Sequence, residues 1–166
     1  MHKEAMDSKD HALREHLLHL LKGGGAHVSL AAALKGVPPK LRGQRPAGAE
    51  HSLWEILEHL RMATWDILEF SRNAKHVSPP WPSGYWPKSQ APPNAAAWQK
   101  SVRSLQADLS AMCKLVKTGS VDLYAKIPHG GGQTILREAL LVADHNSYHL
   151  GEFVLVRRLL GAWGAG

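Results

Sequence analysis

The chain has 166 residues, 44% of them hydrophobic and 20% charged, and a formal net charge of +6. This balance excludes wholesale disorder, and the length predicts a single domain over residues 1–166 with its core at about 8–162. The only cysteine, Cys113, excludes a disulfide framework and a cysteine-rich zinc finger. No apolar run is long enough to cross a membrane, and the first ten residues lack the apolar segment of a signal peptide. We therefore expect a cytoplasmic protein.

Two helices are predicted in the first third of the chain. The first covers about 8–22, because leucines recur there at helical spacing until three consecutive glycines at 23–25 end the pattern. A shorter helix over 29–35 begins at Ser29, a residue type that caps helices well. Residues 37–48 are rich in proline, glycine, lysine and arginine, so a loop is predicted there.

The next helix has the clearest start signal in the sequence. Ser52 and Glu55 form a capping box, in which each side chain can hydrogen-bond the other residue's backbone N–H. One apolar face follows at helical spacing, made of Leu53, Ile56, Leu57, Leu60, Thr64, Ile67 and Leu68. The pattern predicts a helix that ends near Asn73.

A proline-rich segment follows this helix. Residues 78–93 contain six prolines, which exclude a helix or a central strand. Trp81, Tyr85 and Trp86 lie within the segment, and aromatic side chains of this size need cover from solvent. We expect an ordered loop packed across the helices; a plain connection between helices is an equally good interpretation.

Two long helices are predicted in the second half of the chain. The first covers about 94–117, with inward positions at Trp98, Val102, Leu105, Leu109, Met112 and Val116. After a loop over 121–132, the second begins near Thr134, a good N-cap, and runs to Leu160. No segment has a convincing strand pattern. The fold class predicted from the residues is therefore all-α, a four-helix bundle with at least one long connection.

A histidine pair lies on the last predicted helix. His145 and His149 are four residues apart, so both side chains lie on one helix face and could bind one metal ion. His149 belongs to an apolar seam and His145 lies beside it, where an unpaired polar side chain would cost free energy. The seam consists of Ile135, Ala139, Val142, Asn146, His149, Phe153, Val156 and Leu160. Since the chain has 11 histidines, one such pair is unsurprising by chance, and hydrogen bonds across the bundle would also satisfy the two rings.

A metal ion would need a third ligand from another helix. His59 is the best candidate, because it flanks the apolar face of the helix that starts at Ser52. A half-exposed boundary histidine is the alternative. Glu152, three residues after His149, and Asp66 are each interpreted as a fourth ligand or as an acceptor for a ligating histidine. An ordinary surface carboxylate is the alternative for Glu152.

Other candidate residues have structural interpretations. His51 is expected at the start of the helix that follows it, near the mouth of a pocket. Cys113 is interpreted as a small core residue rather than a nucleophile. Surface or boundary positions are expected for six further histidines: His2, His11, His16, His19, His27 and His76.

Parts of two predicted helices resemble a known family. Residues 52–60 (SLWEILEHL), followed by 65–68 (WDIL), resemble the second helix of the DinB-like superfamily, and residues 129–153 resemble its fourth helix. The resemblance extends over about 10–163. It implies the up-down-down-up four-helix bundle of the DinB/YfiT-like metalloenzymes, which are frequently dimers.

The resemblance also implies a metal site. In that family one histidine of the second helix and a His-x-x-x-His pair of the fourth hold a divalent ion, which carries over to His59, His145 and His149. Water or substrate would fill the remaining coordination positions. Zn²⁺ or Ni²⁺ is the expected ion, and Fe²⁺ or Mn²⁺ also suits three imidazoles.

Two classes of function are open. One is a metal-dependent enzyme that acts on a small molecule, either a hydrolase or a thiol-dependent transferase or isomerase of the kind that the resemblance implies. The other is a non-enzymatic, stress-related binding protein whose metal site is structural or vestigial. A fourth protein ligand from Glu152 or Asp66 would favour the structural site, whereas an open position beside a pocket would favour the enzyme.

The remaining predictions concern partners. Basic residues gather in two groups, which are Lys35, Lys40, Arg42 and Arg45, and Arg157 with Arg158. No recognition-helix motif accompanies them, so a solvated basic surface is preferred over nucleic-acid binding. A homodimer is expected through the fourth long helix or its neighbour. This expectation rests on the family resemblance and on apolar residues that face away from the predicted core, such as Trp54, Trp65 and Leu141.

Overall fold

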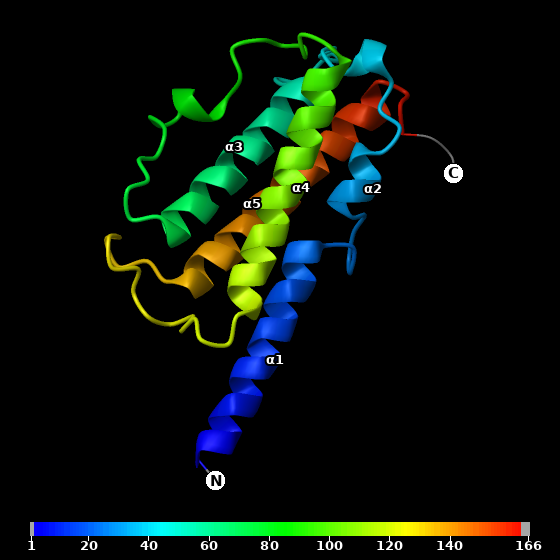
Figure 1. Cartoon of the computed structure of the whole chain (residues 1–166). Coiled ribbons are helices and arrows are strands. Elements are labelled where there is room, and N and C mark those ends of the chain that lie inside the picture. Colours follow the sequence, from blue (N-terminus) through cyan, green and yellow to red (C-terminus); the bar gives the residue numbers. More distant parts are fainter. Residues whose placement is uncertain (1, 164–166) are drawn as a thin grey trace.

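The computed structural model describes residues 2–163 of the chain, with side chains from residue 8 onward. Its elements in chain order are α1 (His2–Lys22), α2 (Leu30–Leu34), the 3-10 helix η1 (Pro39–Leu41), α3 (Leu53–Arg72), the 3-10 helix η2 (Ser83–Tyr85), α4 (Ala95–Lys117) and α5 (Ile135–Leu159). Apart from one isolated bridge between Lys126 and Thr134, the described residues contain no β-structure, so the all-helical fold class is confirmed (Figure 1). Within the described part of the chain, no helix has the length and apolar character needed to cross a membrane.

Polar side chains cap four helices, and three of these caps (Ser29, Ser52 and Thr134) are the residues that the sequence predicts. At the start of α3, the Ser52 hydroxyl accepts from the Glu55 backbone N–H at 3.2 Å, and the Glu55 carboxylate accepts from the Ser52 N–H at 2.8 Å. Ser29, Asn94 and Thr134 cap α2, α4 and α5 with their side chains in the same way. These hydrogen bonds satisfy backbone donors that a helix start leaves unpaired. Each of these four helices therefore begins within one residue of its predicted start.

The first helix is longer than predicted. α1 begins at His2 rather than near residue 8. Residues 2–7 are mostly good helix formers, so the helix extends beyond the leucine pattern that the prediction followed. It ends where predicted, because Gly23 and Gly24 adopt positive φ angles of 67° and 86° that favour glycine.

The four long helices, α1, α3, α4 and α5, lie side by side, and the short α2 lies beyond the C-terminal end of α1 (Figure 1). Their buried side chains form two apolar clusters, one of which contains Phe153 and the other Val142. On α5, Asn146 falls between the two clusters, and its Oδ1 accepts a hydrogen bond from the Thr64 hydroxyl of α3 at 3.3 Å. A polar layer thus separates the two halves of the core where α3 packs on α5.

Three side chains expected at the surface are buried instead. Arg42 and Arg157 belong to the two basic groups of the sequence, but their guanidinium groups donate to backbone carbonyls in and just after α2. Trp54, expected on the back of its helix, packs in the core near Trp98. Arg157 and Trp54 are buried by contacts with distant segments, and the Arg42 guanidinium lies over the ring of Trp98 in α4, so the local sequence pattern does not show these burials.

Candidate metal centre

Three histidines from two helices meet where α3 packs on α5. α3 contributes His59, and α5 contributes His145 and His149, which lie one turn apart on the same face. The Nε2 atom of His59 lies 3.0 Å from that of His145 and 3.1 Å from that of His149. One ring nitrogen of each residue lies within 4.8 Å of the others. The structure therefore brings together the three residues that the sequence singles out.

Oxygen acceptors define the tautomers of two of these rings. His59 donates from Nδ1 to the Tyr85 backbone carbonyl at 2.8 Å, and His149 donates from Nδ1 to the Glu152 carboxylate at 2.8 Å. In the neutral form of each ring, which carries one proton, Nε2 then has a lone pair. These lone pairs face each other at 3.1 Å. Two nitrogen lone pairs at this separation repel each other. A cation bound by both nitrogens would remove this repulsion.

Shifted pKa values keep two of the rings neutral near pH 7. Burial above all, and then the neighbouring His149 and His145, lower the pKa of His59 to about 4, against the opposing hydrogen bond to Tyr85. Burial and His149 also lower the pKa of His145. Neutral imidazole is the form that binds metal, so neither His59 nor His145 has to lose a proton before an ion binds.

Glu152 lies outside the three-histidine group and accepts a hydrogen bond from one of its members. Its two oxygens accept hydrogen bonds from His149 Nδ1 at 2.8 Å and from His51 Nδ1 at 3.1 Å. Burial raises the pKa of Glu152, but these two hydrogen bonds outweigh it and hold the pKa below its usual value. A carboxylate in this position orients the His149 ring and makes its Nε2 more basic. Glu152 is therefore an acceptor for a histidine of the group and not a member of it.

Asp66 lies in a separate network. It accepts hydrogen bonds from His76 Nε2 at 2.7 Å and from the Tyr85 hydroxyl at 2.6 Å, so both of its oxygens are engaged. Burial and Asp66 raise the pKa of Tyr85 to about 12, and the hydroxyl stays a donor. His76 as a whole residue has the intermediate, boundary position that the sequence analysis allows. Its side chain is 6% exposed, because it pairs with Asp66 and packs edge-on against Trp65.

The proline-rich segment covers one side of the histidine group. Trp86 stacks on the ring of His59 at a centroid distance of 4.0 Å and on the ring of His51 at 3.9 Å. Together with the hydrogen bond from His59 to Tyr85, this contact makes the segment an ordered loop packed across the helices, which confirms the first of the two interpretations. Trp81 is the exception, because its side chain is 77% exposed.

The remaining histidines and the cysteine mostly lie where expected. His51 directly precedes the cap of α3 and lines a cavity that also reaches the histidine group. Cys113 is half-buried, and burial raises the pKa of its thiol, in keeping with a packing role. The side chain of His2 lies outside the described residues. Exposed positions are confirmed for His11, His16, His19 and His27.

The nitrogen atoms present fit a divalent transition-metal ion. Neutral imidazoles suit Zn²⁺, Ni²⁺, Fe²⁺ and Mn²⁺. Two nitrogens bound at about 2.1 Å to one ion lie about 3.0 Å apart when their bonds meet at a right angle. The two separations around His59, 3.0 and 3.1 Å, match this value. The three side chains could therefore hold one such ion.

Fold and site together define an all-helical protein with a three-histidine group that could hold a metal ion. Residues 26–153 match the family model of the DinB superfamily. This match covers more than half of the chain, and the chain belongs to the DinB superfamily. The family membership expected from residues 52–60 and 129–153 is thereby confirmed. No curated protein and no solved structure matches the chain.

Proposed function

We propose that this protein binds one divalent transition-metal ion through His59, His145 and His149 and uses it as an enzyme that acts on a small molecule. The observation that carries the metal site is the convergence of three Nε2 atoms, of which that of His59 lies 3.0 Å from that of His145 and 3.1 Å from that of His149. Membership of the DinB superfamily supports the same assignment. Zn²⁺ or Ni²⁺ is the expected ion, and Fe²⁺ or Mn²⁺ suits the same ligands.

The incomplete set of protein ligands favours catalysis over a structural role. A structural zinc site is usually closed by four protein ligands. Here the carboxylate oxygens of Glu152 and Asp66 are all engaged in hydrogen bonds to other side chains, so neither residue completes the set. Three ligands leave positions for water or substrate. An ion held in this way would supply Lewis acidity toward a bound water or thiol.

The chain's own residues prepare a place for the substrate. A cavity of 330 Å³ reaches His51, Tyr148, His149 and Glu152, which is enough volume for a small molecule. Glu152 holds His149 in the tautomer that leaves Nε2 unprotonated, and Trp86 shields one face of the His59 ring. The reaction class rests on the family resemblance, which favours a thiol-dependent transferase or isomerase, with a hydrolase as the alternative.

We further propose one domain with up-down-down-up topology. In Figure 1, α3 and α4 run in the same direction, opposite to α1 and α5. The long connection between α3 and α4 supports this order, because two parallel neighbours need a crossover along their length. Both apolar clusters draw side chains from α3, α4 and α5, which favours a single folding unit.

A homodimer through the outer face of α5 is proposed as well. Leu140, Tyr148, Leu155 and Leu159 are 45%, 74%, 55% and 54% exposed, and their spacing places them on one side of the helix. Monomeric proteins rarely leave a large apolar patch open to water. Sedimentation equilibrium at micromolar concentration should give twice the chain mass of 18.2 kDa. A species of one chain mass would contradict the dimer.

Metal titration of protein stripped with EDTA tests the metal site. Calorimetry with Zn²⁺ and with Ni²⁺ should give one site per chain in the wild type. His59→Ala should weaken binding by about a hundredfold or more, because it leaves two ligands. His16→Ala removes an exposed histidine of α1 and should bind like the wild type. Equal affinity in His59→Ala and the wild type would overturn the assignment.

A further inference from the structure

We propose that a second copy of this chain completes the cavity at the metal centre, through antiparallel pairing of the two α5 helices centred on Gly151. This inference rests on the proposed function, and it adds the register of the dimer and a residue that the partner subunit contributes. The lining of the cavity combines His149 with three exposed side chains of α5, which are Tyr148, Leu155 and Leu159. The surface available for a dimer is therefore also a wall of the site.

One face of α5 is exposed along most of the helix. Exposed residues recur on it at steps of three and four, the spacing of a single helix face, at Leu140, Asp144, Ser147, Gly151, Leu155 and Arg158. Gly151 lies in the middle of this face and has no side chain. A Cβ built there would meet no neighbouring atom within 4 Å. The distance between two packed helices depends on the side chains at their contact, so a second helix can approach closely at Gly151.

Two charged residues lie symmetrically on either side of Gly151. Asp144 precedes it by seven residues and Arg158 follows it by seven, which is about two turns, so both share its face. Both are exposed, and neither forms an ion pair with another described residue. In an antiparallel pair centred on Gly151, Asp144 of each copy lies opposite Arg158 of the partner subunit. Parallel pairing would place like charges opposite each other, so charge complementarity selects a second copy in the antiparallel orientation.

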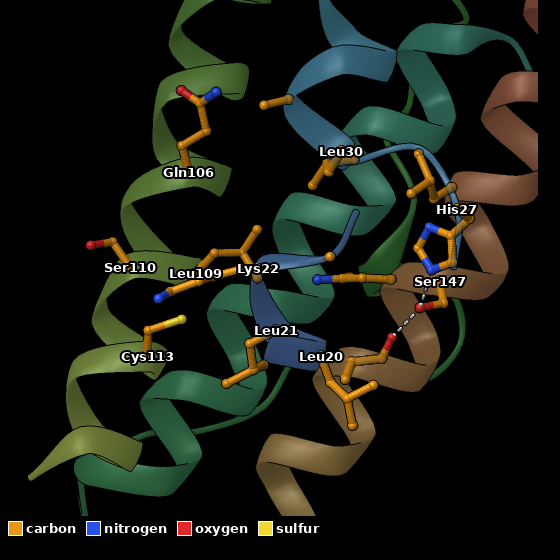
Figure 2. A pocket seen from close by; sticks show the side chains of 15 residues that line it. Leu20, Leu21, Lys22, His27, Leu30, Gln106, Leu109, Ser110, Cys113 and Ser147 are labelled. Carbon is orange, nitrogen blue, oxygen red and sulfur yellow. Dashed lines mark hydrogen bonds between the residues drawn. The ribbon is translucent and has the colours of Figure 1, made fainter. Parts of the chain in front are cut away.

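The two edges of this exposed face have different neighbours. On one edge, the connection between α1 and α2 lies against α5. Figure 2 shows His27 of this connection beside Ser147, with 3.5 Å between the His27 Nε2 and the Ser147 hydroxyl oxygen. On the other edge, Tyr148, Leu155 and Leu159 follow each other at intervals of seven and four residues and form one row. This row lines the cavity of the metal centre.

The symmetry of the pair brings Tyr148 of the partner subunit to this row. A two-fold axis through Gly151 reverses the direction of the helix but keeps the rows of both copies on the same side of the pair. Positions equally far before and after Gly151 lie opposite each other, so the partner's Tyr148 lies at the height of Val154 and beside Leu155. Tyr148 is 74% exposed in the single chain, and this contact would cover its ring. An aromatic ring with a polar tip would then close the outer wall of each cavity.

Charge reversal tests the antiparallel pairing. Asp144→Arg and Arg158→Asp each place like charges opposite each other at two points of the dimer, so each should weaken self-association by about a hundredfold. A mixture of the two variants restores both pairs of opposite charges and should associate about as tightly as the wild type. Sedimentation equilibrium measures the dissociation constants, and Arg103→Asp, an exposed reversal on α4, should match the wild type. A monomeric wild type, single variants that dimerise like the wild type, or a mixture that stays monomeric would overturn the proposal.

A disulfide tests the centre of the pair. In a Cys113→Ser background, Gly151→Cys places the two thiols next to the two-fold axis and within reach of each other, so mild oxidation should link the chains. Leu140→Cys is the matched control. It lies eleven residues from the centre, its two copies would be about 33 Å apart, and it should stay unlinked. An unlinked Gly151→Cys or a linked Leu140→Cys would overturn the proposal, and the charge reversals stand even where a cysteine variant does not fold.

The mixed dimer tests the contribution of the partner's Tyr148 to the cavity. The Asp144→Arg chain carries ¹³C-labelled leucine methyl groups, and the unlabelled Arg158→Asp chain carries either Tyr148 or Tyr148→Ala. The Leu155 methyl signals of the labelled chain should shift when the partner lacks the ring, whereas Tyr124→Ala in the partner, at another exposed tyrosine, should leave them in place. Unchanged Leu155 signals would overturn the proposal. All samples contain EDTA, so failure of the metal site in the calorimetric titration would leave these measurements unaffected.

Discussion

Glu152 connects two histidines that would otherwise act separately. One of its oxygens accepts from His51 and the other from His149, and these bonds hold its pKa below the usual value in spite of burial. A negative charge next to His149 Nδ1 strengthens the ring as a metal ligand through its other nitrogen. The residue thus affects metal affinity without contacting the ion.

Replacing Glu152 by glutamine should therefore weaken metal binding and leave the fold intact. Glu152→Gln keeps an oxygen for the His149 N–H but removes the charge, so we expect a loss of affinity of about tenfold or more. Calorimetric titration with Zn²⁺ measures the effect. Glu15→Gln, on the exposed side of α1, is the matched control and should have no effect. An unchanged affinity in Glu152→Gln would show that the carboxylate plays no part in the site.

The buried imidazoles should make the metal-free protein sensitive to mild acid. The pKa of His59 is about 4 in the folded chain and that of His145 is also lowered, whereas an unfolded histidine titrates at about 6.5. The unfolded chain therefore binds more protons below about pH 6.5, and the free energy of unfolding falls as the pH falls from 7 to 5. Urea unfolding in EDTA at both pH values measures this change. His59→Phe should show a smaller change, and an equal or larger change would refute this explanation.

At the scale of elements, Ser52 joins α3 to the loop that covers the histidines. Its hydroxyl accepts from the Glu55 N–H and donates to the Gln90 carbonyl at 2.6 Å. The serine is fully buried, so neither bond is readily replaced by water. The start of α3 and the end of the proline-rich loop are therefore held together by one side chain.

Loss of this cap should destabilise the protein measurably. Ser52→Ala removes both hydrogen bonds, and we expect a decrease of about 1–2 kcal/mol in the free energy of unfolding. Chemical denaturation measures it. Ser29→Ala removes the corresponding cap of the five-residue α2 and is the matched control, with a smaller expected decrease. A Ser52→Ala variant as stable as the wild type would contradict the role of this residue.

Local signals explain how much of the helical fold could be predicted. The caps at Ser29, Ser52 and Thr134 are short-range patterns, and each predicts a helix start within one residue. The length of α1 was underestimated because the prediction relied on apolar periodicity. Burial of Arg42, Arg157 and Trp54 depends on segments far away in the chain, which periodicity does not show.

The candidate site could be predicted in part for the same reason. His145 and His149 are adjacent on one helix by spacing alone, and the family resemblance adds His59. The contacts of Tyr85 and Trp86 with His59 were missed, since no local pattern indicates which helix a loop covers. The aromatic residues within 78–93 predict that this loop packs against the helices. They do not indicate which helix it contacts.

At the scale of the whole molecule, we expect the fold to form without the ion. Two apolar clusters stabilise the helices, and hydrogen bonds to Tyr85 and Glu152 hold two of the three histidines in place. Apolar clusters of this kind supply most of the stability of a folded chain. Metal bound to the folded chain would add to it according to concentration and affinity.

Removing the ion should consequently lower the melting temperature without unfolding the protein. We expect metal-free wild type and His149→Ala to melt cooperatively, less than about 10 °C below the metal-loaded wild type. Thermal melts followed by circular dichroism, with and without EDTA, measure this. Loss of helical structure at 25 °C in both samples would instead indicate a structural metal site, in which the ion is required for folding.

The metal content of protein prepared without an affinity tag tests the central claim most directly. Elemental analysis of wild type, His149→Ala and the control His16→Ala, all expressed with Zn²⁺ and Ni²⁺ in the medium, is the measurement. We expect one divalent ion per chain in the wild type and in His16→Ala, and less than about a tenth of that in His149→Ala, because two imidazoles hold an ion far more weakly than three. A wild type without metal, or a His149→Ala variant with the same metal content as the wild type, would contradict the three-histidine site.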